Sequence, residues 1–298
     1  LNGFNDMFRN ATGVDGEGFN PPLVIFDGRF DELNSVDGTL GIADSKEVTF
    51  SFWLKKSAAA DGTNNIVFSN HFYNIRCRFE TDNKFSIWWQ NDPISTQIWG
   101  GKSTSTRTSA DGWFHILHSI NSATGAVHTF LDGVAETMVT DGGLPFPTPN
   151  NVPINLAFGS NGFTIGEYST NVGAANSGQQ WDGMMSQFYF ATNYIDITVQ
   201  ANREKFVSGT GANAKPVDFG TTGSRPTGSQ PVVYLNNPSA TFHVNAGTGG
   251  NFTNAGGAVL KSGGYFNGNI YSSNSFTNSY EVMQGIGIEN QVSTFNIG

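Results

Sequence analysis

The strongest constraint on the fold of this chain is the alternating pattern over positions 48–56. One face of this run carries the apolar residues Val48, Phe50, Phe52 and Leu54, and the other carries Thr49, Ser51, Trp53 and Lys55. Successive side chains of a β-strand point to opposite faces, so a period of two places one face of the strand against a core. The run therefore predicts a half-buried strand.

Further strand-sized runs follow at regular spacing. They occupy residues 23–26, 65–68, 72–79, 84–89, 113–120, 127–131, 154–158, 163–168 and 184–191. The gaps between them contain turn dipeptides that end in glycine: Asp61-Gly62, Asp111-Gly112, Thr124-Gly125, Asp132-Gly133, Asn161-Gly162 and Asp182-Gly183. Short strands punctuated in this way predict an all-β fold, a two-sheet antiparallel jelly-roll sandwich. One short helix is expected at 199–207, with Thr198 as its cap.

Composition and pattern divide the chain into four segments. Residues 1–20 are glycine-rich without a period and are expected to form an N-terminal arm, while residues 21–208 form the jelly roll. Residues 209–262 are a connector rich in Gly, Thr and Pro, and its strand at 231–235 is expected to pack back on the jelly roll. Residues 263–298 are expected to form an extended, β-rich C-terminal arm.

The C-terminal arm combines many aromatic residues with very little charge. From residue 221 to the end, four residues carry charge: Arg225, Lys261, Glu281 and Glu289. The aromatic residues expected to make subunit contacts are Phe266, Tyr271, Phe276, Tyr280 and Phe295. Such a segment is too aromatic for an ordinary disordered tail and too poor in charge for a free arm, so we expect it to bury against a neighbouring subunit. A second small β unit of the same chain is the alternative.

The charge of the chain limits its partners. Charged residues make up 13% of the sequence and the formal net charge is −9, whereas about a quarter of the residues of a globular protein usually carry charge. An acidic surface repels phosphate backbones and anionic lipids, so neither nucleic acid nor a membrane is an expected partner. The single cysteine, Cys77, rules out an internal disulfide and is expected to be a small buried hydrophobe.

Several stretches resemble the concanavalin A-like, laminin-G-type domains. Residues 48–54 resemble the early core strand of that family, and residues 111–115 with 130–134 resemble a strand and a hairpin that turns at Asp132-Gly133. Residues 181–190 resemble the closing strand. The resemblance covers residues 21–207 and implies the same jelly roll.

A narrower resemblance connects the chain with laminin-G-type proteins encoded by tailed phages and prophages. The stretches that carry it are 187–190, 195–196, 202–206, 215–218, 231–238 and 242–252. Because proteins of that group are regarded as virion proteins, the resemblance implies a structural or decoration protein on the virion surface. It would assemble as a homo-oligomer and contact other virion proteins and cell-surface glycans. The alternative is a secreted or surface carbohydrate-binding module or adhesin.

We find no pattern in the sequence that indicates catalysis. Glycoside hydrolases with this fold need two carboxyl groups that flank the scissile bond, but the nearest match, Glu80 and Asp82, brackets an expected turn. His118 shares a strand face with apolar residues and His115 lies on the opposite face, which predicts that His118 is a hydrogen-bonded core histidine. We expect a protein that is not an enzyme, with a glycoside hydrolase as the remote alternative.

The sequence requires no cofactor, but calcium is an ion that this fold often uses. Four aspartates at expected strand ends are candidate ligands for a structural calcium ion: Asp27, Asp31, Asp132 and Asp182. Backbone carbonyls at strand ends can complete an oxygen site of this kind. Three of the four precede glycine, however, and are equally explained as turn residues.

Glycan binding is the remaining specific hypothesis. Sugars bind to exposed aromatic faces flanked by amide and carboxyl groups, and the candidate residues are Trp88, Trp89, Trp99, Asn91 and Asp92. Because Trp88 and Trp89 are adjacent in an expected strand, their side chains must point to opposite faces. One of the two is expected in the core, and the other faces either solvent or a subunit contact.

Overall fold

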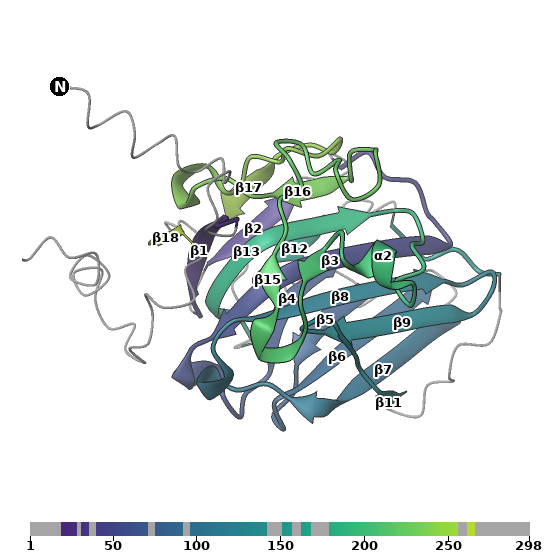
Figure 1. Cartoon of the computed structure of the whole chain (residues 1–298), viewed down its shortest axis with the longest axis horizontal. Coiled ribbons are helices and arrows are strands. Elements are labelled where there is room, and N and C mark those ends of the chain that lie inside the picture. The colour runs from purple at the N-terminus through teal and green to yellow at the C-terminus, as the bar shows by residue number, and fades with distance from the viewer. Residues whose placement is uncertain are drawn as a thin grey trace, which may run out of the picture.

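The computed structural model describes residues 19–28, 31–35, 40–70, 75–91, 96–141, 151–156, 162–167, 179–255 and 261–265. These residues form two large antiparallel sheets that pack against each other (Figure 1). Of the helices in this described part, none is both long and apolar enough to cross a membrane. The two-sheet sandwich confirms the predicted all-β jelly-roll class.

The first sheet contains strands from both ends of the described chain. They are β1 (Pro22–Asp27), β3 (Glu47–Lys56), β8 (Phe114–Asn121), β9 (Ala126–Leu131), β10 (Val134–Ala135), β13 (Asp182–Ala191), β16 (Val233–Leu235) and β18 (Lys261–Tyr265). Their spatial order is β10-β9-β8-β3-β13-β1-β18, and β16 pairs with β13 beside this path. The alternating run at 48–56 is thus β3, which lies between β8 and β13.

The second sheet is assembled in the same way from distant segments. Its strands are β2 (Glu32–Ser35), β4 (Asn65–Asn70), β5 (Ile75–Phe79), β6 (Lys84–Asn91), β7 (Thr96–Thr106), β11 (Met138–Thr140), β12 (Phe163–Ile165) and β17 (Phe252–Ala255). Their order is β11-β7-β6-β5-β4-β12-β2-β17. Both sheets therefore include strands from beyond residue 208, so the sandwich extends past the expected boundary between jelly roll and connector.

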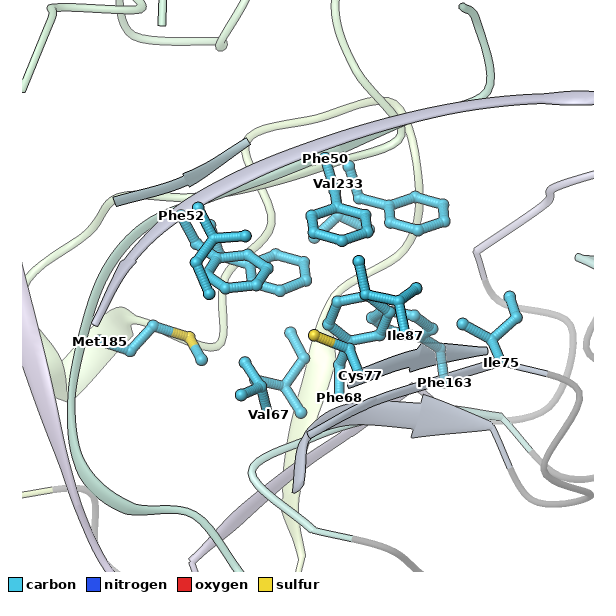
Figure 2. Packing of buried hydrophobic residues seen from close by; sticks show 14 of the residues in the cluster. Phe50, Phe52, Val67, Phe68, Ile75, Cys77, Ile87, Phe163, Met185 and Val233 are labelled. Atoms are coloured by element: carbon cyan, nitrogen blue, oxygen red, sulfur yellow. The ribbon is translucent and has the colours of Figure 1, made fainter. Parts of the chain in front are cut away.

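The core between the two sheets is dominated by aromatic side chains (Figure 2). Phe50 and Phe52 of β3 are stacked with their ring centroids 5.3 Å apart, and Phe68 of β4 meets Phe50 edge-on at 5.1 Å. Phe188 of β13 stacks on Phe52 at 5.5 Å. Cys77 of β5 is fully buried among these residues, as expected. Stacked and edge-on ring contacts add to the free energy gained from burying apolar area.

A smaller third layer covers part of the outer face of the first sheet. It contains the helix α2 (Gln200–Arg203), the strand pair β14 (Val207–Ser208) and β15 (Lys215–Pro216), and the segment that leads to β16 (Figure 1). Phe206 and Phe219 from this layer meet the ring of Tyr189 on β13 edge-on, at 5.3 and 5.8 Å. This layer buries Tyr189 and Ala191 on the outer face of β13.

The predicted helix is shorter in the structure, and most of the two predicted arms lies outside the described residues. The helix spans four residues instead of 199–207, because the chain tightens into turns with Asn202 and Arg203 as acceptors and then enters β14 at Val207. Its cap position is Val199, whereas the Thr198 hydroxyl donates to Asp196 Oδ1. The expected arm contacts of Phe266, Tyr271, Phe276, Tyr280 and Phe295 lie outside the described residues, as does nearly all of the expected N-terminal arm.

Candidate functional site

Trp88 is a half-buried side chain on the outer face of the second sheet. Its neighbours on β6, Ile87 and Trp89, belong to the core, so Trp88 points away from the core. Its cross-strand neighbour on β5 is Arg76. The guanidinium of Arg76 lies over the indole ring, with 4.4 Å between its carbon and the ring centroid. This cation–π contact holds the ring against the sheet.

A carboxylate fixes the edge of the same indole ring. Trp88 Nε1–H donates to Oδ2 of Asp141 over 2.8 Å, and the hydroxyl of Ser86 donates to the same oxygen over 2.8 Å. The orientation of the ring is therefore set before any ligand arrives. An ordered aromatic ring with a carboxylate at its edge is an arrangement that can recognise a molecule with both apolar and hydroxyl surfaces.

The charged residues near Trp88 on this face are paired with each other. Arg78, two residues from Arg76 on β5, contacts Glu80, and Lys102 contacts Asp82 with 2.6 Å between Nζ and Oδ2. Glu80 and Asp82 flank a turn in which Asn83 has a φ of 60°. Their interpretation as turn residues rather than a catalytic pair agrees with these contacts.

Trp89 and Trp99 do not form part of an exposed surface, contrary to their prediction as candidate sugar-binding residues. Trp89 is 0% exposed and Trp99 is 2% exposed. Trp99 lies directly opposite Trp89 in the β6–β7 ladder, so both side chains point into the core. Both rings stack on His118, with centroids 5.8 and 5.3 Å from the imidazole. Of the three candidate tryptophans, Trp88 alone faces outward.

Of the two polar residues predicted to bind sugar beside Trp88, the structure describes one, Asn91. Asn91 is half-buried, and its amide donates to the backbone carbonyl of Pro153 over 2.7 Å, which gives it a role in holding the chain at residues 151–156. Asp92 lies outside the described residues. Sequence reasoning missed Arg76, Ser86 and Asp141. Ser86 follows from alternation within β6 and Arg76 from pairing β5 with β6, whereas Asp141 is 53 residues from Trp88 and gives no local signal.

Three of the four aspartates predicted as calcium ligands lie near one another, whereas the fourth, Asp132, lies elsewhere. Asp27 of β1 and Asp182 of β13 are cross-strand partners of each other. Oδ2 of Asp31 accepts a hydrogen bond from the backbone N–H of Asp27 over 2.6 Å. Asp132 is bound instead to Arg107 and to the backbone N–H of His115. Within the described ranges, no cluster of three or more His, Cys, Asp or Glu side chains has a geometry that could hold a metal ion.

The sequence reasoning also missed a pair of buried carboxyl groups. Glu32 of β2 and Glu167, just beyond β12, are 1% and 0% exposed, and their side chains are hydrogen-bonded to each other. Desolvation, followed by the charge of Glu167 and this hydrogen bond, raises the pKa of Glu32 well above its ordinary value of 4.5. Retaining glycosidases separate their carboxyl groups by about 5 Å to accommodate the sugar. A directly bonded, inaccessible pair does not match that geometry.

The two histidines of β8 are buried without charge. Burial lowers the pKa of both His115 and His118 to about 3. His118 packs in the core, as predicted, where Trp89 Nε1–H and the Thr129 hydroxyl are its hydrogen-bond partners. His115 lies on the other face, with Nε2 2.8 Å from the hydroxyl of Ser51 and the Trp53 ring at 4.9 Å. Both are 0% exposed.

Comparison with known proteins gives distant structural likenesses. No family model matches the sequence, and no curated protein matches it. The heptameric SAP-like pentraxin from Limulus polyphemus is similar with a TM-score of 0.44 and 12% identity over 59% of this chain and 78% of that one. Domains LG4-5 of the mouse laminin α1 chain are similar with a TM-score of 0.39 and 9% identity over 69% of this chain and 50% of that one.

A third likeness is to domain 4 of AbnA, a GH43 extracellular arabinanase from Geobacillus stearothermophilus, in complex with arabinotriose. The TM-score is 0.39 with 15% identity over 62% of this chain and 76% of that chain. The assignment of the jelly-roll sandwich to the present chain follows from its own strand order and antiparallel pairing.

Proposed function

We propose that this protein is a non-catalytic, glycan-binding β-sandwich whose binding surface lies around Trp88 on the outer face of the second sheet. The observation that carries the proposal is the fixed orientation of the Trp88 ring between the Arg76 guanidinium and the Asp141 carboxylate. A pyranose ring has one apolar C–H face that can stack on an indole, and its hydroxyl groups can donate to a carboxylate. Trp88 and Asp141 provide these two kinds of contact side by side.

The state of the ionisable residues supports binding rather than catalysis. His115, His118, Glu32 and Glu167 are buried and have partners inside the fold. General acid–base catalysis requires a group within hydrogen-bonding reach of a bound substrate, and none of these four side chains is exposed to solvent. Glu80 and Asp82, which are nearer to Trp88, are bound to Arg78 and Lys102.

A glycan array probed with the wild type and Trp88→Ala tests this proposal. We expect the wild type to bind a defined set of glycans and Trp88→Ala to lose that binding. Val199→Ala is a suitable control, because Val199 is 47% exposed and precedes α2 in the layer over the other sheet. Equal binding by the wild type and Trp88→Ala, or no binding by the wild type, would contradict the proposal.

We also propose, from the sequence, that the protein is a homo-oligomeric structural or decoration protein on the surface of a tailed-phage virion. Its support is the resemblance to phage-encoded laminin-G-type proteins and the aromatic, low-charge segment 263–298. In this setting the outer face around Trp88 would point towards host or environmental glycans. A secreted or cell-surface carbohydrate-binding module would use the same surface, and the oligomeric state distinguishes the two.

A further inference from the structure

Lys56, the last residue of β3, holds its amino group in an enclosed polar site. The side chain is 0% exposed, and Nζ lies 5.1 Å from the centroid of the Phe79 ring. Nζ donates to Oδ1 of Asn83 over 2.7 Å and to the backbone carbonyl of Arg107 over 3.3 Å. Oδ1 of Asp61 is also 3.3 Å from Nζ. A buried amine thus contacts both a carboxamide and a carboxylate.

The Asn83 carboxamide is polarised by a second donor. The backbone N–H of Gly62 donates to the same Oδ1 atom over 2.9 Å. Two donors on one carbonyl oxygen increase the positive character of the carbon Cγ, and the Gly62 N–H is placed to stabilise negative charge that develops on the oxygen. Asn83 itself is partly exposed in the turn between β5 and β6, so a leaving group released from it has a path to solvent.

We propose that Lys56 and Asn83 join through an intramolecular isopeptide bond between Nζ and Cγ, with Asp61 as the proton-transfer group. Asp61 accepts one proton from the Lys56 ammonium, and the neutral amine then attacks Cγ of Asn83. The bond between Cγ and Nδ2 breaks, and Nδ2 takes up protons from the attacking nitrogen and from Asp61. One ammonium ion leaves, Asp61 ends as a carboxylate, and no oxidant or reductant takes part.

The surroundings of Lys56 favour this reaction in three ways. Burial lowers the pKa of Lys56, although the nearby Asp61 and Asp111 carboxylates act in the opposite direction. The Phe79 ring excludes water from one side of the amine. Hydrogen bonds from the Ser109 backbone N–H and hydroxyl hold the Asp61 carboxylate in place. Fixed positions for the nucleophile, the carbonyl carbon and the base replace a collision by an intramolecular encounter.

The bond would connect the two sheets covalently. Lys56 ends β3 of the first sheet, while Asn83 lies in the turn between two strands of the second sheet, 27 residues further along the chain. A cross-link of this kind limits the conformations of the unfolded chain, as a disulfide does. It would tie the two sheets together in a chain whose one cysteine cannot form an internal disulfide.

The test is the intact mass of the purified, folded full-length chain under denaturing conditions, followed by peptide mapping. The expected mass is lower than the sequence mass by one ammonia, and the digest should contain one branched peptide that joins Lys56 to Asn83. Lys56→Met, Asn83→Ala and Asp61→Ala should each have their full sequence mass. The exposed pair Lys46 and Asn151 is an internal control, since its Nζ and Oδ1 are 2.8 Å apart and it should remain unlinked.

The mass and the peptide map of the wild type decide the question even if a variant fails to fold, because the branched peptide is found only when Lys56 and Asn83 are joined. A folded wild type with its full sequence mass overturns the proposal. So does a mass deficit that persists in Lys56→Met, because ammonia loss would then come from cyclisation of an asparagine.

Discussion

The indole Nε1–H of Trp89 donates a hydrogen bond to Nε2 of His118, 3.1 Å away, inside the core between the two sheets. Because Nε2 is the acceptor, the proton of the neutral imidazole lies on Nδ1, which is 2.9 Å from the hydroxyl of Thr129. The ring is therefore fixed in one tautomer by partners on two other strands. Protonation would turn Nε2 into a donor that faces another donor.

This arrangement predicts that the protein loses stability in mild acid. The folded state holds the pKa of His118 near 3, whereas an unfolded histidine titrates at about 6.5. The unfolded chain therefore binds the extra proton first, and the free energy of unfolding should decrease as the pH falls from about 6.5 towards 3, by about 1.4 kcal/mol per pH unit for each such histidine. Urea unfolding at a series of pH values measures this slope.

His118→Gln provides the comparison, since a glutamine oxygen can accept from Trp89 without titrating. The slope of the free energy of unfolding against pH should decrease by the contribution of one histidine. The contribution of His115 should remain. An unchanged slope in this variant would show that His118 does not control acid stability.

The adjacent tryptophans of β6 should separate binding from stability. Trp89→Ala removes a fully buried ring and should lower the free energy of unfolding by about 3–5 kcal/mol. Trp88→Ala removes a half-buried ring from the outer face and should cost about 1 kcal/mol or less, while glycan binding is lost. Chemical denaturation and glycan binding of the two variants provide the measurements. A large stability loss in Trp88→Ala would point to a structural role for this residue instead.

The carboxyl pair predicts a second pH dependence with the opposite sign. The folded state raises the pKa of Glu32 above its ordinary 4.5 because of burial and the neighbouring Glu167. The folded chain keeps a proton that the unfolded chain releases, so the stabilisation is complete below about pH 4.5 and is lost as the pH rises through the raised pKa. Glu32→Gln should therefore be more stable than the wild type at alkaline pH and similar to it at about pH 5. Thermal unfolding of both proteins checks this, and parallel profiles would contradict it.

Removal of residues 266–298 tests the proposed assembly. The truncated chain retains β18 and both complete sheets, so we expect a folded monomer with an unchanged far-ultraviolet circular dichroism spectrum. The full chain should form a larger species. Size-exclusion chromatography with light scattering compares the two, and identical oligomeric states would show that the segment does not mediate assembly.

The sequence predicted those features that depend on local periodicity. Alternation located β3, and adjacency in a strand placed Trp88 and Trp89 on opposite faces. The inward position of Trp99 was missed because it depends on pairing with Trp89, which alternation within one strand does not specify. The Glu32–Glu167 pair and the Lys56 site were missed for a related reason. Their members lie on different strands or turns, and tertiary packing alone brings them together.

The strand order has a consequence for synthesis on the ribosome. β1 lies between β13 and β18, and β2 lies between β12 and β17, so each of the first two strands has both of its neighbours in the second half of the chain. While the first half emerges, β1 and β2 have no partner to complete their backbone hydrogen bonds. The nascent polypeptide cannot complete the second sheet until translation has passed residue 255, or the first sheet until it has passed residue 265, and both β1 and β2 wait through the synthesis of more than a hundred residues for their partners.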